Sequence, residues 1–97
     1  MDRYLIESPH EAADCDNIVR QVAAAGYLHN FDWGCHDGVH VGWAVVEAVS
    51  PEHASQMVPW AVRGKARIVK LIKFEASDYY HDQPLHETSS KGSSTKK

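Results

Sequence analysis

The sequence predicts an α+β domain in which a four-stranded antiparallel sheet carries two helices on one face. Four stretches of alternating or continuous apolar residues, bounded by turn residues, are typical of strands. Two further stretches, with apolar residues three and four positions apart, are typical of helices. Their order along the chain is β-α-β-β-α-β. The 97 residues fit one small domain with little stability to spare, for which a partner subunit would be an advantage.

The first strand and the first helix are expected at the beginning of the chain. Residues 4–7 are typical of a short strand, and the run Ser8-Pro-His-Glu11 predicts the start of a helix with a capping box. The helix is expected to continue to about residue 25 and to end at Gly26. Its apolar positions form one buried stripe, and Cys15 lies on that stripe.

A hairpin is predicted around Asp37-Gly38, a pair of residues that favours tight turns. Its two strands are expected over residues 27–35 and 39–49. A two-residue turn places Cys35 opposite His40, with their Cβ atoms about 5 Å apart on one face. A register slip of one residue would exchange the faces, so the face that Cys35 occupies stays open.

The second half of the chain repeats the pattern of the first. The run Ser50-Pro-Glu-His53 predicts a second helix start, and Pro59 is expected to interrupt this helix. The last predicted strand covers residues 66–74. We therefore expect one domain over residues 1–75 and an extension over residues 76–97. The extension begins with a short helical turn and is expected to be disordered from about residue 87.

The predicted order of elements is that of the ferredoxin-like split βαβ arrangement. Two right-handed crossovers place both helices on one face of the sheet and leave the other face bare. The third strand is apolar on both sides, because Ala44 and Val46 alternate with Trp43 and Val45. A bare apolar face of this kind marks an interface, so the sequence predicts a homodimer packed sheet to sheet.

Over about residues 3–75 the chain resembles the small ferredoxin-like proteins that pair into dimeric α+β barrels. Four segments carry the resemblance, and they look like segments of uncharacterised bacterial proteins of about this length: Arg3-Tyr-Leu-Ile-Glu-Ser-Pro-His10, Phe31-Asp-Trp-Gly-Cys35, His40-Val-Gly-Trp-Ala-Val-Val-Glu47 and Lys65-Ala-Arg-Ile-Val-Lys70. The wider group includes a nickel-binding protein, cofactor-independent monooxygenases and muconolactone-type isomerases. The resemblance implies the fold but no particular activity, because one fold hosts many functions. The chain has no full catalytic motif of these enzyme families, so no catalytic residue is carried over.

Charge and composition argue against several kinds of partner. The net charge of -3 gives no reason to expect a nucleic-acid partner, because binding of nucleic acid needs clustered Lys and Arg. No apolar run approaches the roughly 20 residues that span a membrane, and the first residues lack the apolar region of a signal peptide. We expect a cytoplasmic protein, in which Cys15 and Cys35 are free thiols rather than a disulfide.

A transition-metal site is the leading functional hypothesis, with a binding or sequestering protein favoured over an enzyme. Thiolate and imidazole ligands suit nickel, zinc or copper. The predicted ligands are Cys35 and His40, with His36 or His10 as further candidates. The alternative is a well-packed hairpin without chemistry. The C-H-x3-H spacing lacks the second half of a zinc finger, and strand alternation directs His36 away from Cys35.

The predicted topology separates some of the candidate ligands. His10 and His53 are expected in the first turns of the two helices, at the end of the sheet opposite the Asp37-Gly38 turn. His10 is therefore expected to meet Cys35 only across a dimer. The simpler interpretation of the histidines outside the hairpin is that they lie on the surface, which applies to His10, His53, His81 and His86.

An enzyme is the second hypothesis, with its site on the bare face of the sheet. The residues expected to line this pocket are Asn30, Asp32, Trp43 and Glu47. Asp32 is expected opposite Trp43, and Asp32 or Glu47 could act as a general base. The reaction would be a cofactor-independent isomerisation or monooxygenation of a small aromatic or lactone substrate. A structural or regulatory dimer without chemistry is the third hypothesis.

Overall fold

The structure is a computed structural model that describes residues 1–80 of the chain. Its central element is a four-stranded antiparallel sheet with the strand order β2-β3-β1-β4. The strands are β1 (Asp2–Pro9), β2 (Phe31–Trp33), β3 (Val41–Ala48) and β4 (Arg67–Leu71). The predicted α+β class and the four-stranded antiparallel sheet are confirmed.

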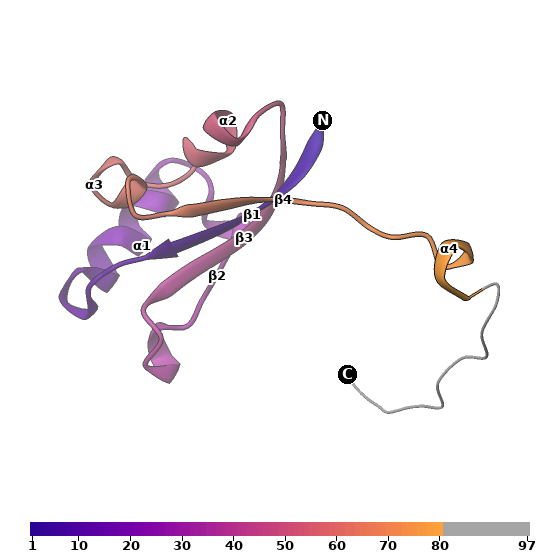
Figure 1. Cartoon of the computed structure of the whole chain (residues 1–97). Coiled ribbons are helices and arrows are strands. Elements are labelled where there is room, and N and C mark those ends of the chain that lie inside the picture. The colour runs from indigo at the N-terminus through magenta and orange to yellow at the C-terminus, as the bar shows by residue number, and fades with distance from the viewer. Residues whose placement is uncertain (81–97) are drawn as a thin grey trace.

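The α-helices between the strands lie against one face of the sheet (Figure 1). The α-helices are α1 (Cys15–Ala24), α2 (Pro51–Ser55), α3 (Trp60–Arg63) and α4 (Ser77–Tyr80). Short 3-10 helices precede α1, β2 and β3, and they are η1 (Ala12–Asp14), η2 (Leu28–Asn30) and η3 (Cys35–Asp37). Figure 1 shows that α4 lies apart from the sheet, at the end of an extended segment that follows β4.

The hydrophobic core lies between the sheet and α1, α2 and α3. Alternate residues of β1 and β3 face this core, so Tyr4 pairs with Val46 and Ile6 pairs with Ala44. The connecting segments complete the core with Ile18, Val22, Ala54, Val58 and Val62. The opposite face of β3 carries Val45, which is 53% exposed. The predicted alternation of the third strand is therefore confirmed.

The first strand is longer than the sequence predicts. β1 continues to Pro9 and the α-helix begins only at Cys15, so the predicted helix start at Ser8-Pro-His-Glu11 is wrong. Pairing with β3 includes Pro9, and the next amide, that of His10, donates to the carbonyl oxygen of His40 at 3.0 Å. Pro9 lies beyond the part of β1 that pairs with β4, so its missing N–H faces no neighbouring strand on that side.

The connection between β2 and β3 differs from the predicted two-residue turn. Residues 34–40 connect the strands, and η3 occupies the middle of this segment. Gly38 ends η3 with a φ of 79°, which a glycine adopts without steric cost. An Asp-Gly pair can therefore end a 3-10 helix as well as form the turn of a tight hairpin. The predicted register is nevertheless present, because Asp32 pairs with Trp43.

Local signals in the second half of the chain predict the structure well. The Ser50 side chain accepts a hydrogen bond from the His53 amide at 3.1 Å, as a helix N-cap does. Pro59 separates α2 from α3, as predicted. The short α4 falls in the segment for which a helical turn is expected. The predicted disorder from residue 87, and both His81 and His86, lie outside the described residues.

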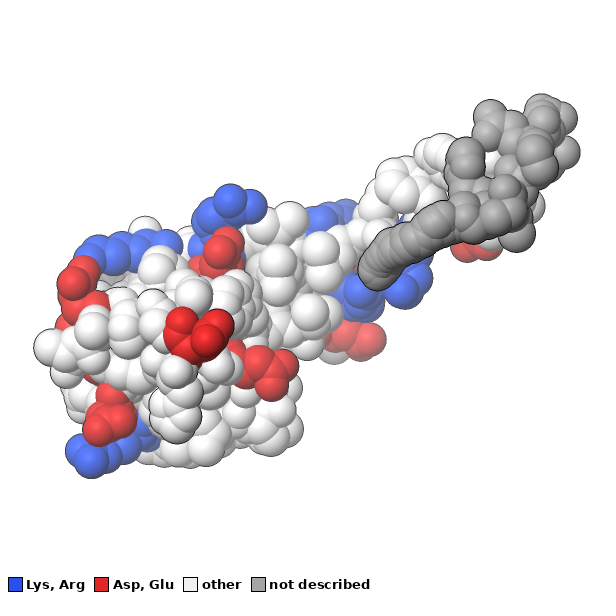
Figure 2. Space-filling view, turned by 90° about the horizontal axis from the view of Figure 1, so that it is seen from below, with Lys and Arg blue, Asp and Glu red and all other residues white. Residues whose placement is uncertain are grey.

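The surface carries charges of both signs. Figure 2 shows acidic and basic side chains interspersed on the visible face, around a broad area of uncharged side chains. Within residues 1–80, no helix is long and apolar enough to cross a membrane. The cytoplasmic location and the lack of a nucleic-acid partner stay predictions.

Close packing at Gly42 predicts a measurable effect of one added methyl group. A Cβ at Gly42 would lie 2.8 Å from Cζ3 of Trp33, which packs against the core and stacks on Phe31. We expect Gly42→Ala to lower the free energy of unfolding by about 1–3 kcal/mol, measured by urea denaturation. Gly64→Ala is the matched control, because nothing lies within 4 Å of its added Cβ. Equal effects of the two substitutions would contradict the close approach of Trp33.

Candidate metal centre

Four potential metal ligands meet where β1 ends, α1 begins and η3 connects β2 to β3. They are His10, Cys15, Cys35 and His40, and one ligand atom of each lies within 4.8 Å of all the others. His10 is buried, and the other three are half-buried. We call these four residues the Cys2His2 cluster. Three separate segments of the chain supply it, so no short sequence motif contains it.

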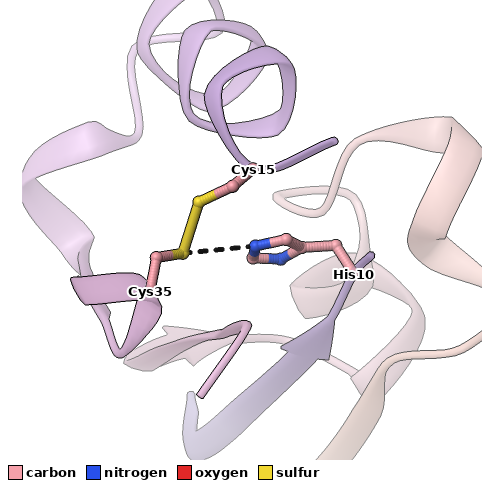
Figure 3. Close-up of a disulfide and its surroundings, with 3 residues drawn as sticks. All are labelled: His10, Cys15 and Cys35. Carbon is pink, nitrogen blue, oxygen red and sulfur yellow. Dashed lines mark hydrogen bonds between the residues drawn. A yellow bond between two sulfur atoms is a disulfide. The ribbon is translucent and has the colours of Figure 1, made fainter. Parts of the chain in front are cut away.

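His10 reaches the cluster because β1 continues past Ser8. Alternation along β1 directs Ser8 and His10 toward the face that the helices cover, and both are buried. The His10 Nε2 atom lies 3.3 Å from the Cys35 Sγ atom (Figure 3). The expectation that His10 meets Cys35 only across a dimer is therefore wrong. It assumed that His10 belongs to a helix, whereas His10 directly follows a strand.

Cys35 and His40 lie at the two ends of the connection between β2 and β3. Cys35 is the first residue of η3, and His40 directly precedes β3. The antiparallel register of these strands brings the two ends together, as the sequence predicts. His36, the next residue of η3, is exposed and is not a member of the cluster.

Cys15 is the member of the cluster that the sequence analysis did not identify as a ligand. It is the first residue of α1, and the start of this helix lies beside η3 and the end of β1 (Figure 3). Cys15 lies on the predicted apolar stripe of the helix, but it is only half-buried. The predicted helix start at Ser8 placed Cys15 in the second turn of the helix. Its proximity to Cys35 could therefore not be predicted.

The two cysteines form a disulfide in this structure (Figure 3). Neither Cys15 nor Cys35 is free, so the expectation of free thiols is wrong. Their Cα atoms are 7.1 Å apart, just above the usual range of about 4.4–6.8 Å for disulfides. The cluster therefore has two chemical forms. One is a disulfide beside two imidazoles, and the other, after reduction, would have four potential metal ligands.

Both imidazoles of the cluster have an unsatisfied nitrogen. The Nδ1 atoms of His10 and His40 are buried, and neither has a hydrogen-bond partner within residues 1–80. The centres of these two rings are 6.1 Å apart. A buried polar atom without a partner costs about 1–3 kcal/mol, so such an atom calls for an explanation. For His10, coordination beside Cys35 would use Nε2, which lies 3.3 Å from that sulfur, and would leave Nδ1 without a partner, so metal binding can explain only the unsatisfied Nδ1 of His40.

A cavity lies beside the two sulfur atoms. Its volume is about 320 Å³, and its lining residues are Cys15, Asp16, Val19, Trp33, Cys35 and His36. Trp33 also lies close to the imidazole of His10, at 6.1 Å between ring centres. Both cysteines of the cluster therefore border one cavity, whose wall also includes Trp33.

The residues of the predicted catalytic pocket do not converge in the single chain. Asp32 and Trp43 are paired on the bare face, but Asn30 belongs to η2 rather than to a strand. Glu47 is four residues from Trp43 along β3, or about 13 Å at the rise of an antiparallel strand. Asp32 and Glu47 are both exposed. The enzyme hypothesis therefore gains no support from this arrangement.

In comparisons with known proteins, no family model, curated protein or solved structure matches this chain. The class of this protein is therefore defined by its fold and by the ligand atoms of the Cys2His2 cluster. They define an α+β domain with a His/Cys/Cys/His group that is close enough to hold a metal ion.

Reduction of the disulfide is expected to destabilise the metal-free chain. Cys15 and Cys35 are 20 residues apart, and a crosslink across a loop of this size contributes about 3 kcal/mol through the entropy of the unfolded chain. Urea denaturation in the presence of a chelator, with and without a phosphine reductant, measures this difference. A variant with both Cys15→Ser and Cys35→Ser is the control, and the reductant should not change its stability. Equal stability of the oxidised and reduced wild type would contradict the disulfide.

Proposed function

We propose that this chain is a small metal-binding protein whose reduced form holds one divalent transition-metal ion. The Cys2His2 cluster supplies the ligands, and zinc is the ion that we favour. The observation that supports this proposal is that four ligand atoms lie within 4.8 Å of one another. The role is binding or sequestration rather than catalysis, because a closed set of four protein ligands leaves no open position for a substrate.

The distances within the cluster suit a tetrahedral ion after a small contraction. Zinc bonds of about 2.3 Å to sulfur and about 2.0–2.1 Å to nitrogen place the ligand atoms roughly 3.3–3.8 Å apart. Imidazole nitrogens within 4.8 Å of the sulfurs need to move by about 1 Å or less. The sulfur atoms must separate from bonding distance, and the wide Cα spacing of Cys15 and Cys35 favours that separation.

The donor chemistry favours borderline and soft ions over hard ones. Two thiolates and two imidazoles in tetrahedral geometry are typical of zinc, whereas magnesium and calcium prefer oxygen ligands. Nickel and copper are the other ions that such ligands accept. Because geometry decides between these ions, the tetrahedral arrangement that four such ligands adopt around zinc makes zinc our first candidate.

Metal loading of the reduced protein tests the proposal directly. We expect native mass spectrometry to find about one zinc ion per chain after reduction and zinc addition, as a single four-ligand site requires. We expect His40→Ala to weaken zinc binding by more than the roughly 10–100-fold that loss of an outer-shell partner costs. The oxidised wild type should bind zinc far more weakly than the reduced form, because its sulfurs are no longer thiolates.

His36→Ala provides the matched control for the loading experiment. His36 lies next to Cys35 in the same 3-10 helix, but it is exposed and outside the cluster. Its substitution should leave zinc affinity unchanged. Equal losses in His36→Ala and His40→Ala, or no stoichiometric zinc in the reduced wild type, would exclude the proposed ligand set.

We further propose that the sheet has the ferredoxin-like arrangement and that two chains pair through its bare face. The strand order and the antiparallel pairs support the arrangement. The bare face carries both charged and apolar side chains. Its charged residues include Arg67 and Glu7, which form an ion pair with 3.7 Å between Nε and Oε1. The apolar side chains on this face belong to three adjacent strands, and they are Leu5, Val41, Trp43, Val45, Val69 and Leu71.

A charge in the centre of this bare face should prevent dimer formation. Val45 is 53% exposed on that face, and burial of an added carboxylate between two sheets is costly. We expect the wild type to sediment as a dimer and Val45→Glu to sediment as a monomer. Trp60→Glu is the control, because Trp60 is 81% exposed but belongs to α3 on the helical side. A monomeric wild type, or dissociation by both substitutions, would contradict the proposed interface.

A further inference from the structure

We infer that the Cys2His2 cluster is a site of reaction with small hydroperoxides, and that this reaction releases the metal ion by joining Cys15 to Cys35. The inference rests on the proposed function, since it concerns the same four ligands. Two features of the structure support it: the disulfide that joins two potential metal ligands, and the cavity that both cysteines line.

The disulfide and the metal-bound form exclude each other because they use the same two sulfur atoms. The structure shows Cys15 and Cys35 joined, within the group that also contains His10 and His40. In a disulfide the sulfurs are about 2.05 Å apart and carry no charge, whereas two thiolates on one zinc ion are roughly 3.8 Å apart. Formation of the disulfide therefore removes two of the four ligands at once. The two remaining imidazoles form an incomplete site.

The cavity beside the sulfurs gives a small oxidant access to them. It has a volume of about 320 Å³, and both Cys15 and Cys35 contribute to its lining. One water molecule takes up about 30 Å³ in the liquid, so hydrogen peroxide or a short alkyl hydroperoxide fits. Both sulfurs border one cavity, so the second cysteine is in place to react with the product of the first.

The reaction balances with one hydroperoxide molecule as the two-electron oxidant. One thiolate attacks the terminal peroxide oxygen, so an S–O bond forms, the O–O bond breaks, and the departing oxygen takes a proton and leaves as an alcohol or water. The second thiolate attacks the sulfur of this sulfenic acid. An S–S bond forms, and the hydroxide that leaves takes a proton to become water. The two thiolates are oxidised, the peroxide is reduced, and the metal ion keeps its charge.

The first experiment uses the reduced, metal-free wild type, so that it does not depend on metal binding. Addition of about one equivalent of hydrogen peroxide should convert the two thiols to the Cys15–Cys35 disulfide, seen by intact mass and peptide mapping. In Cys15→Ser the reaction should stop at a sulfenic acid on Cys35, which dimedone traps. Oxidation to sulfinic acid in the wild type, without the disulfide, would overturn the inference.

The second experiment uses the same wild type after zinc loading, with a chromogenic zinc chelator as the readout. We expect about one zinc ion to be released for each hydrogen peroxide molecule consumed, together with the disulfide, and reloading after reduction. His36→Ala should behave like the wild type, because His36 lines the cavity but is not a cluster residue. Zinc that stays bound after oxidation would overturn the inference.

The two experiments separate failure of this inference from failure of the proposed function. If reduced protein never takes up zinc, the proposed function is wrong, and metal release is excluded with it. If zinc loads stoichiometrically but peroxide neither releases it nor forms the disulfide, the proposed function stands and the inference alone is wrong.

Discussion

One backbone hydrogen bond decides the arrangement on which the candidate site depends. The amide of His10 donates to the carbonyl oxygen of His40 at 3.0 Å and extends the β1–β3 ladder past Pro9. Such a bond contributes only about 0.5–1.5 kcal/mol to stability. Its structural effect is larger, because it keeps His10 in extended backbone beside His40. Strand alternation then directs the His10 side chain toward the helices and the Cys35 sulfur.

The Cys2His2 cluster also fixes the start of α1 against the end of the sheet. In the oxidised chain the Cys15–Cys35 disulfide connects α1 to η3. A metal ion bound to the same residues would connect the same two segments. A domain of this size buries a small core, so crosslinks of either kind matter for its stability.

Comparison of two similar sequence runs shows how much of the fold the sequence could predict. Ser50-Pro forms the predicted N-cap, because β3 ends at Ala48, which pairs with Asp2 at the beginning of β1. Within residues 1–80, no strand pairs with β3 beyond Ala48. Ser8-Pro has the same local chemistry, but Ser8 pairs with Gly42, so the chain stays in the sheet. Capping signals are local in the sequence, whereas the presence of a partner strand depends on the tertiary fold. A capping signal alone therefore does not determine whether a helix starts. The alternation of β3 was predictable, because burial of one face determines it.

The difference between local signals and long-range strand pairing also explains which candidate ligands could be predicted from the sequence. Cys35 and His40 are close in the sequence, and their strand register brings them together whether the connection is a tight hairpin or a 3-10 turn. His10 is among the predicted candidates, but His10 and Cys15 meet Cys35 within one chain only because β1 is longer, and α1 starts later, than local signals indicate. The end of β1 depends on its pairing with β3, which is distant in the sequence. A candidate metal site built from three segments can therefore be identified only once the register of the whole sheet is known.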